Sequence, residues 1–470
     1  MTGRQDLTAA LAALSSVDRE ALARVPDEEQ RSVLFRELLA GQGISGPDDL
    51  SVAENVLVYP ELREAVFARL PPLPERNTRY FPGIGTPGLR KAVADRLGRS
   101  LGAPISQDDV FGAAGVSGAL ASIAAGLQLE GGPVPRGSSV LLPAPFWQGF
   151  YWCFDQQAGL KCRPVHLADR DTFQPTLDDL KTAYRENPDA KLLVLTNPHN
   201  PLGYNYDPAL LESVYEWALG STDLHIISDE MYCHSQLEAT PVPFASALAL
   251  EATAAAPDRV HVVWGFAKDF GLSGFRAGFL ISRSPWVHRA MLGDRANRRN
   301  SLGWFSPYDS LKHFFTESVL AAEDHTFWER VMRLYRRRLT ESFEAVARVL
   351  DVHAIRYVHR PDSNSTQFFW LDLREFLAVP PDDGPADDGP AAATSTPILF
   401  GDGRSWDPET YLANDIADHA GVKLLTGTEL SCSTPGYYRL CFTALDRDRV
   451  VDAVERMCRY LISRPRLGPS

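Results

Sequence analysis

The chain has 470 residues, of which 44% are hydrophobic and 23% are charged, and its formal net charge is -13. This composition is typical of a globular protein of two or three domains, and the negative charge argues against a nucleic-acid partner or an anionic membrane surface. Because we find neither a cationic start followed by an apolar stretch nor a long apolar run, we expect no signal peptide and no membrane span.

Residues 1 to about 50 are polar and rich in Ala, Leu and Arg, which predicts a helical N-terminal arm. An amphipathic helix is predicted over 88–97. Farther along the chain, helical patterns alternate with short apolar runs. The runs that we predict to be strands are 138–142, 191–195, 224–228, 260–264 and 276–281. Short apolar strands separated by helices predict an α/β fold with a mostly parallel sheet covered on both faces.

A long charged helix is predicted over about 325–350, and it should lead into a smaller α+β domain. The predicted elements of that domain are strands at 366–371 and 437–442 and helices at 408–420 and 447–463. An acidic stretch rich in Pro, Gly and Asp lies at about 378–397, and we expect a disordered surface insertion because such a composition cannot pack. We divide the chain into an N-terminal arm with part of the small domain, the large domain and the small domain, over 1–75, 76–325 and 326–470.

Lys268 comes shortly after the apolar run at 260–264, and a glycine-rich turn with Arg276 follows it. An amine at the end of a buried strand loses hydration, so its pKa falls and it becomes a usable nucleophile. Such a lysine can bind an aldehyde cofactor covalently. Taken alone, the window favours a lysine that merely caps a strand at the surface, because most lysines are solvated. Other loops of the chain reverse that preference.

Two further strand ends carry groups that suit such a cofactor. Two Asn-Pro steps within 197–203 make a rigid turn, from which Asn200 can donate a hydrogen bond to a phenolic oxygen. Asp229 ends the next strand, where a buried carboxylate needs a cation, and a protonated pyridine nitrogen would serve. Tyr232 lies three residues farther on and can share the phenolic oxygen with Asn200.

Three other segments add anion-binding and aromatic groups. Gly115-Val116-Ser117 precedes an Ala-rich helix, and free amides at a helix start bind phosphate. Trp147 follows a strand and can lie over a planar ring, although core packing is an equal alternative. Arg276 suits a phosphate and Arg439 a carboxylate, whereas either arginine by itself is more often a surface or ion-pair residue.

As a set, these residues resemble the site of fold type I enzymes, the aspartate-aminotransferase-like enzymes that use pyridoxal 5'-phosphate. The resemblance covers about 50–460 and implies a large domain with a mostly parallel seven-stranded sheet covered by helices, a smaller α+β domain and a homodimer. Within that superfamily the chain is most similar to 1-aminocyclopropane-1-carboxylate synthases. The stretches that carry this likeness are 53–55, 195–203, 268–276, 363–374 and 432–439.

The resemblance implies a role for each residue toward the cofactor. Lys268 would bind it covalently and then move the α-proton of the substrate. Asp229 would pair with the pyridinium, while Asn200 and Tyr232 would hold the phenolic oxygen. Trp147 would stack on the ring. The phosphate would be held by Gly115, Val116, Ser117, Arg276 and Tyr80, the last of these from a neighbouring subunit.

Toward the substrate, the resemblance implies that Arg439 clamps the α-carboxylate, with Asn200 and Tyr80 beside it. Glu54 matches a glutamate that the family places near a sulfonium group, and a plain aminotransferase would not require a carboxylate there. We therefore expect an enzyme that acts on S-adenosylmethionine. The α-proton is removed, methylthioadenosine leaves from the γ-carbon, and the four-carbon unit closes to a cyclopropane or is captured by a second substrate in specialised metabolism.

Two alternatives stay open from the sequence. The first is an ordinary aminotransferase that moves an amino group between an amino acid and a 2-oxo acid. The second is a protein that binds the cofactor without catalysis, against which the retained lysine, aspartate and carboxylate-binding arginine argue. The six cysteines are scattered, without a C-x-x-C pair, so we expect free thiols in the reducing cytoplasm and no metal site.

The chain departs from the family pattern around the substrate. Gly265 and Ala267 stand where two serines normally precede the lysine, so two hydroxyls near the phosphate are missing. His199 replaces a small residue beside Asn200, and an ordinary loop histidine is the favoured interpretation. Ser365-Thr366 also replace small residues. These changes leave the final product open.

Overall fold

The computed structural model describes residues 15–27, 30–31, 34, 38, 46–238, 240–294, 301–304, 307–320, 326–358, 360–377, 398–399 and 405–464.

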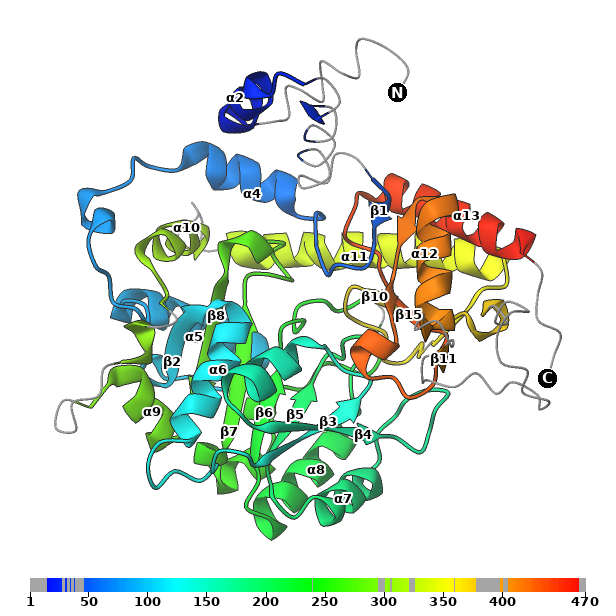
Figure 1. The fold of residues 1–470 in the computed structure, drawn as a ribbon. Helices are drawn as coiled ribbons and strands as arrows, with labels where there is room; N and C mark the ends of the chain where they lie inside the picture. The colour runs from blue at the N-terminus through cyan, green and yellow to red at the C-terminus, as the bar shows by residue number, and fades with distance from the viewer. Residues whose placement is uncertain are drawn as a thin grey trace.

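Within the described residues, seven strands form one large sheet in the order β2-β8-β7-β6-β5-β3-β4 (Figure 1). The neighbours from β4 to β7 are parallel, whereas β8 runs antiparallel to both β7 and β2. The mostly parallel sheet predicted from the sequence is therefore confirmed. The bounds are β2 Val110–Ala114, β3 Ser139–Ala144, β4 Lys161–His166, β5 Ala190–Thr196, β6 His225–Asp229, β7 Val260–Gly265 and β8 Ala277–Ser282.

Helices cover both faces of this sheet, because successive side chains of each buried strand point to opposite sides. In β5, Leu192 and Val194 pack into the cluster that contains the apolar side of α6, while Leu193 and Leu195 pack into the cluster that contains α5, α7 and α8. The helix predicted at 88–97 is α5, which Thr86 caps at its start. The bounds are α5 Pro87–Leu101, α6 Gly115–Leu127, α7 Leu177–Glu186, α8 Pro208–Ser221, α9 Pro285–Leu292 and α10 Ser310–Leu320.

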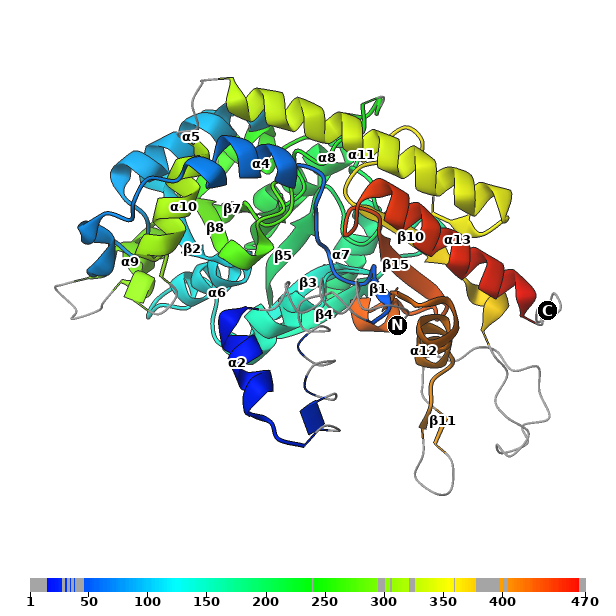
Figure 2. The same cartoon turned by 90° about the horizontal axis from the view of Figure 1, so that it is seen from above.

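A second sheet, with the strand order β14-β15-β10-β9, lies in the C-terminal part of the chain. The long helix α11 (Phe327–Val352) extends from beside α10 to α13 and spans both sheets (Figures 1 and 2). The predicted strands and helices of this part are confirmed, with ends shifted by one or two residues. Their bounds are β10 Phe368–Asp372, β15 Tyr437–Cys441, α12 Pro408–Ala420 and α13 Arg447–Ser463, and the short strands β9 Arg356–Tyr357 and β14 Leu425–Thr426 were not predicted.

The N-terminal segment joins this second part, since β1 (Asp48–Asp49) pairs with β13 (Val422–Lys423). Of the predicted N-terminal helices, α2 covers Ser16–Arg24, and most of the remainder of 1–45 lies outside the described residues. The acidic insertion at 378–397 also lies outside them. The remaining elements are α4 Tyr59–Ala65, β11 Ile398–Leu399 and β12 Ser405–Trp406. The division into three domains stays a proposal.

The described residues include no helix that is both long enough and apolar enough to cross a membrane. All six cysteines carry free thiols.

Candidate active site

Three neighbouring parallel strands bring the predicted site residues to one edge of the large sheet. Asn200 follows β5, Asp229 is the last residue of β6, and Lys268 lies three residues past β7. Because these strands run in the same direction, their carboxyl ends meet at the same edge, where open α/β sheets bind their ligands. Three loops that are separate in the sequence thus lie together at a single site.

The Lys268 side chain is partly buried, and its Nζ donates a hydrogen bond to the carbonyl oxygen of Ala53 at 2.6 Å. Loss of hydration lowers the pKa of this amine, while the charge of Glu54 acts in the opposite direction. The lowered pKa agrees with the expectation for a lysine that serves as a nucleophile and proton carrier.

Asp229 is 5% exposed, and its Oδ1 accepts a hydrogen bond from the Met231 N–H at 3.2 Å. Among the described residues, no basic side chain forms an ion pair with it. Burial therefore raises the pKa of Asp229 to about 7. A buried carboxylate with so little compensation fits a cationic partner, and the ring nitrogen of pyridoxal phosphate supplies that charge when protonated.

Arg439, on β15, is the second buried charge of the site and is 3% exposed. Its Nη1 donates to Asn200 Oδ1 at 2.9 Å, and its Nη2 donates to the Ser51 carbonyl oxygen at 2.5 Å. In the part of the chain that the structure describes, its Nε has no hydrogen-bond partner and no carboxylate pairs with the guanidinium. These features fit the predicted binding of a substrate carboxylate.

Phe368, at the start of β10, connects Arg439 with Tyr232. The Arg439 guanidinium lies 4.6 Å from the centre of the Phe368 ring, and the Tyr232 ring meets Phe368 edge-on at 5.3 Å. Since Asn200 already uses its oxygen on Arg439, its Nδ2 group is the donor for a phenolic oxygen. Tyr232 is buried, and burial raises its pKa, so its hydroxyl stays protonated.

The start of α6 and Arg276 together form the predicted phosphate end. Gly115 opens α6 with φ 72°, and a Cβ there would come within 2.7 Å of Arg276 Nη2, so the arginine lies against the helix start. Ser117 belongs to the first turn of the same helix, beside Val116. The amides, the helix dipole and the guanidinium all favour an anion here.

In the family pattern two serines precede the lysine. At one of these two positions, packing explains why this chain has no serine. A Cβ on Gly265 would lie 2.7 Å from the Ala277 carbonyl oxygen, because β8 approaches β7 closely there. Ala267 is buried. A phosphate group at this end would therefore meet the start of α6 and Arg276 but no hydroxyl at positions 265 and 267.

Trp147 is half-buried and meets the rings of Phe150 and Trp152 edge-on, at 5.5 and 6.0 Å. A Cβ on Gly149 would overlap the Trp147 ring, so the glycine makes room for this ring position. Trp147 packs with one side against the core and is partly exposed, so the predicted stacking on a planar ring stays a prediction.

The segment Ala53-Glu54-Asn55 lies against the turn that carries Lys268. Asn55 Nδ2 donates to the carbonyl oxygens of Lys268 and Asp269, at 2.9 and 3.1 Å. Ser273 Oγ lies 2.8 and 2.6 Å from the two carboxylate oxygens of Glu54. Glu54 is partly buried and, among the described residues, forms no ion pair with a basic side chain. The Ser273 contact could not be predicted, because 219 residues separate the two side chains in the sequence.

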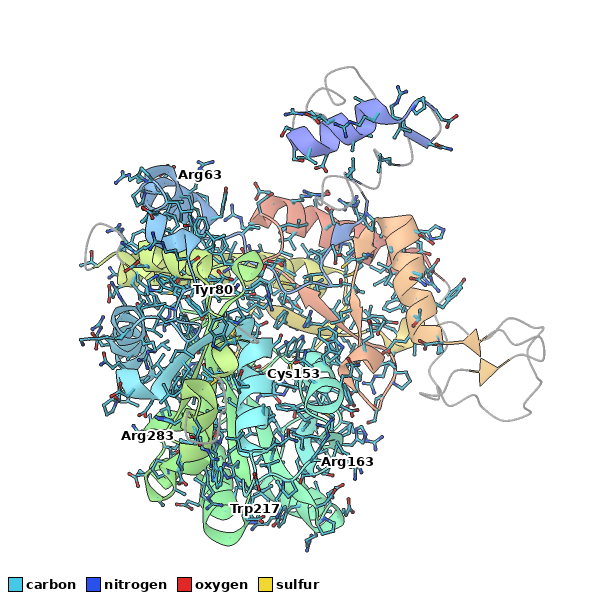
Figure 3. All side chains as sticks on the ribbon, turned by 60° about the vertical axis from the view of Figure 1, so that its left-hand side comes forward. Arg63, Tyr80, Cys153, Arg163, Trp217 and Arg283 are labelled. Atoms are coloured by element: carbon cyan, nitrogen blue, oxygen red, sulfur yellow. The ribbon has the colours of Figure 1, made fainter. Side chains whose placement is uncertain are left out.

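Tyr80 and His199 lie apart from the other residues of the candidate site. Tyr80, which is labelled in Figure 3, is 92% exposed. Its ring contacts Trp304 at 5.4 Å, which is not one of the predicted site residues. His199 is buried against Tyr204 and Tyr206, and burial lowers its pKa to about 3. A neutral, packed histidine agrees with the ordinary loop interpretation.

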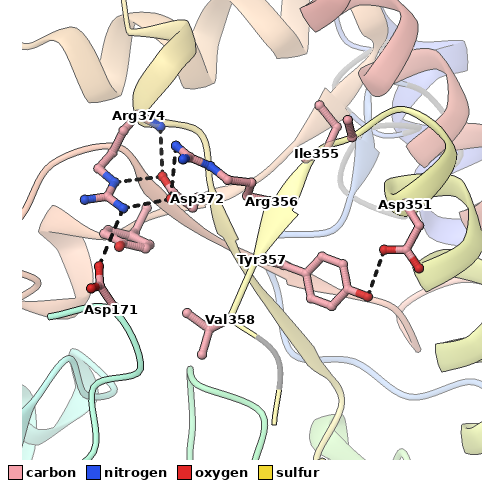
Figure 4. A pocket seen from close by; sticks show the side chains of 10 residues that line it. Asp171, Asp351, Ile355, Arg356, Tyr357, Val358, Asp372 and Arg374 are labelled. Carbon is pink, nitrogen blue, oxygen red and sulfur yellow. Dashed lines mark hydrogen bonds and ion pairs between the residues drawn. The ribbon is translucent and has the colours of Figure 1, made fainter. Parts of the chain in front are cut away.

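A separate pocket of about 640 Å³ lies beside β9 and the end of β10 (Figure 4). Its basic groups are already paired, since Arg374 binds Asp372 through two hydrogen bonds of 2.8 Å and Arg356 lies 3.3 Å from the same carboxylate. Its lining contains none of the predicted site residues, so we place the candidate site at the sheet edge instead.

Comparison with known protein families gives a match over most of the chain. The family model described as aminotransferase class I and II matches residues 52–457. The 1-aminocyclopropane-1-carboxylate synthase 2 of Solanum lycopersicum is 27% identical over 386 residues, which cover 80% of this chain and 70% of that protein. The 1-aminocyclopropane-1-carboxylate synthase 1 of Oryza sativa subsp. indica is 28% identical over 339 residues, which cover 70% of this chain and 61% of that protein.

Solved structures share the fold. The aspartate aminotransferase from Thermus thermophilus with maleate superposes with a TM-score of 0.66 at 22% identity, covering 94% of this chain and 98% of that one. The aromatic aminotransferase from Pyrococcus horikoshii OT3 has the same TM-score at 20% identity, with 90% and 97% covered. This protein therefore belongs to the class I and II aminotransferase family and is a fold type I enzyme that depends on pyridoxal phosphate.

Proposed function

We propose that the enzyme acts on S-adenosylmethionine: it removes the α-proton, expels methylthioadenosine from the γ-carbon, and lets the four-carbon unit close to a cyclopropane or bond to a second substrate. The observation that carries this proposal is Glu54. Its carboxylate is oriented by Ser273, lacks a basic partner among the described residues and acts electrostatically on Lys268. A partly buried carboxylate without an ion-pair partner favours a cationic substrate group such as a sulfonium. The similar proteins of Solanum lycopersicum and Oryza sativa are both named 1-aminocyclopropane-1-carboxylate synthase, and that name contains the cyclopropane product of the proposed reaction.

Each residue of the site then has a task. Arg439 takes the α-carboxylate through its unpaired Nε and so orients the α-carbon. Asp229 holds the positive charge of the cofactor ring, while Asn200 and Tyr232 hold the phenolic oxygen. Lys268 binds the cofactor and, once released from it, accepts the α-proton, for which a lowered pKa suits its amine.

Bound pyridoxal phosphate withdraws electrons from the α-carbon and so makes its hydrogen acidic. The start of α6, Arg276 and Trp147 position it, and we assign Tyr80 of a second subunit to the phosphate. This last assignment would explain why so large an aromatic side chain is 92% exposed in the single chain. It also implies that the active unit is a homodimer.

An ordinary aminotransferase is the second candidate, and the shared fold with aspartate and aromatic aminotransferases favours it. Such an enzyme needs Lys268, Asp229 and Arg439 but has no use for a carboxylate at position 54. Glu54 therefore separates the two candidates.

The test is incubation of the purified enzyme with S-adenosylmethionine, with methylthioadenosine measured by mass spectrometry. Glu54→Gln should lower kcat/KM for this substrate by roughly 100-fold, while the amount of bound cofactor stays unchanged. Glu212→Gln is the matched control, because Glu212 is also partly buried and also accepts hydrogen bonds, from the Glu251 and Ala252 N–H groups. Turnover of amino-acid and keto-acid pairs alone, without methylthioadenosine, would establish the aminotransferase instead.

A further inference from the structure

We propose that Tyr335 and Gln367 are positioning residues for Lys268, and that they act through a closed ring of buried hydrogen bonds that includes the lysine's own peptide group. The inference rests on the proposed role of Lys268 as the proton carrier, but it does not depend on which amino acid is the substrate.

The ring has four hydrogen bonds. Gln367 Nε2 donates to the Lys268 carbonyl oxygen at 3.0 Å and to Tyr335 Oη at 2.8 Å. Tyr335 Oη lies 2.7 Å from Ser235 Oγ, which donates to Asp269 Oδ1 at 2.6 Å. The peptide bond between Lys268 and Asp269 closes the ring.

The chemistry of each pair of partners decides which of the two donates the hydrogen bond. A carbonyl oxygen only accepts, so the nitrogen of Gln367 must face Lys268, and its other hydrogen points to Tyr335. While Asp269 is ionised, Ser235 donates its only proton to Asp269, so the Tyr335 hydroxyl donates to Ser235. Three of the four bonds, from Gln367 through Tyr335 and Ser235 to Asp269, then run in one direction, and donors aligned in this way strengthen one another.

The ring is shielded from water and draws on three separate parts of the fold. Asp269, Ser235, Tyr335 and Gln367 are each 0% exposed. Tyr335 lies on α11, Gln367 directly precedes β10, and Ser235 follows β6. Because α11 spans both sheets (Figure 1), the lysine turn is held from the second sheet as well as from the first.

Asp269 also lies beside two side chains, Cys233 and His234, that are of a type that can bind a metal ion. Cys233, His234 and Asp269 bring ligand-type atoms within 4.8 Å of one another. However, Asp269 already accepts from Ser235 Oγ and from the His234 N–H. Burial raises the pKa of the Cys233 thiol and lowers that of His234 to about 3, so both groups stay neutral. Both carboxylate oxygens of Asp269 are therefore already engaged by hydrogen bonds, one of them within the ring.

Removing the Tyr335 hydroxyl should loosen the lysine without removing any group that touches the substrate. In Tyr335→Phe, Gln367 Nε2 and Ser235 Oγ each lose one partner, while Asn55 still holds the Lys268 carbonyl. We expect the lysine amine to be misplaced, so the rate at which the Cα hydrogen of a bound amino acid exchanges with deuterium should fall roughly tenfold or more, with KM nearly unchanged.

The experiment compares Tyr335→Phe with Tyr308→Phe in the cofactor-loaded enzyme. Tyr308 is equally buried, and its hydroxyl bonds to Thr316 Oγ1 at 2.5 Å, so the control also loses a buried hydroxyl pair. Two quantities are measured: the Cα exchange rate and the pH at which the cofactor absorbance is half-changed. Tyr335→Phe should slow the exchange and move the absorbance midpoint by about half a pH unit or more, whereas Tyr308→Phe should change neither.

Ser235→Ala breaks the ring at another bond and provides the same readouts if Tyr335→Phe does not fold. Because both changes open one ring, the double variant should be little worse than either single variant. Equal exchange rates and midpoints in the Tyr335 and Tyr308 variants, or independent multiplication of the two single effects, would overturn the inference. If the wild-type enzyme exchanges no Cα hydrogen but its absorbance midpoint still moves in Tyr335→Phe, the proposed function fails while the positioning role stands.

Discussion

Replacement of Asp229 by asparagine should stabilise the cofactor-free protein and weaken the loaded one. Asp229 is buried with one N–H donor and no ion-pair partner among the described residues, so its charge is unfavourable until the cofactor ring supplies a cation. Functional sites often contain a group that lowers the stability of the protein without its ligand, and an uncharged substitution of that group restores the stability.

The magnitude follows from the pKa. A rise from 3.8 to about 7 corresponds to roughly 4 kcal/mol, at 1.36 kcal/mol for each pH unit. The folded pKa lies above the unfolded one, so the loss of stability is absent below pH about 4, grows as the pH rises, and is complete above about 7. The asparagine amide leaves one N–H group poorly paired, at about 1–3 kcal/mol, and the net gain at pH 8 is therefore about 1–3 kcal/mol.

Thermal unfolding of the cofactor-free protein measures this gain. For 470 residues, an unfolding entropy of about 2.1 cal/mol/K per residue converts 1 kcal/mol into about 1 °C. We expect Asp229→Asn to melt about 1–3 °C above the wild type at pH 8, with no advantage at pH 5 and a lower melting temperature than the wild type once the cofactor is bound.

Glu230→Gln is the matched control. Burial also raises the pKa of Glu230 to about 7, but this carboxylate accepts from Ser228 Oγ, Ser246 Oγ and the Ala247 N–H at 2.8–3.0 Å. An amide nitrogen would face those donors, so this variant should be less stable than the wild type at pH 8. A cofactor-free Asp229→Asn protein that melts below the wild type at pH 8 would refute the reasoning.

Three further substitutions test the rest of the site. Gly149→Ala should displace the Trp147 ring, because the added methyl group overlaps it, and the absorbance and binding constant of the cofactor should both change. Gly115→Ala should raise the cofactor Kd at least severalfold in a binding titration, since it strains a backbone with φ 72° and pushes against Arg276. Arg439→Lys should lower kcat/KM for an amino acid by about 100-fold, because a lysine cannot reproduce the paired contacts of a buried guanidinium.

A glycine elsewhere provides the control for the two alanine variants. A Cβ on Gly88, in the first turn of α5, meets nothing within 4 Å, so Gly88→Ala should leave the cofactor binding constant unchanged. Loss of cofactor in that variant would show that the site is sensitive to any substitution of this kind.

The strands that are buried on both faces could be predicted from the sequence. The runs that form β5 and β7 are mostly apolar, which predicts buried strands, and the polar residues shortly after them, such as Asn200 and Lys268, are site candidates for that reason. Two strands of the large sheet could not be predicted. Lys161–His166 forms the edge strand β4, which contains Pro164 and is largely exposed, while Val110–Ala114 ends in Gly and Ala, which give little apolar signal.

Contacts between residues far apart in the chain could not be predicted. Glu54 and Ser273 are brought together by the packing of the segment 53–55 on the lysine turn, and neither residue indicates the other in the sequence. The same holds for Tyr335, which resembles any core tyrosine of a long amphipathic helix until its hydroxyl is placed beside Gln367 and Ser235. Side-chain direction in such cases depends on tertiary packing rather than on local pattern.

The central claim, that Lys268 is the residue that holds the cofactor, can be tested by borohydride reduction of the loaded protein followed by mass spectrometry of its peptides. We expect the mass of one reduced cofactor on the peptide that contains Lys268, and no such addition in Lys268→Ala. A label on another lysine, or a wild-type protein that takes up no label, would contradict the proposed site.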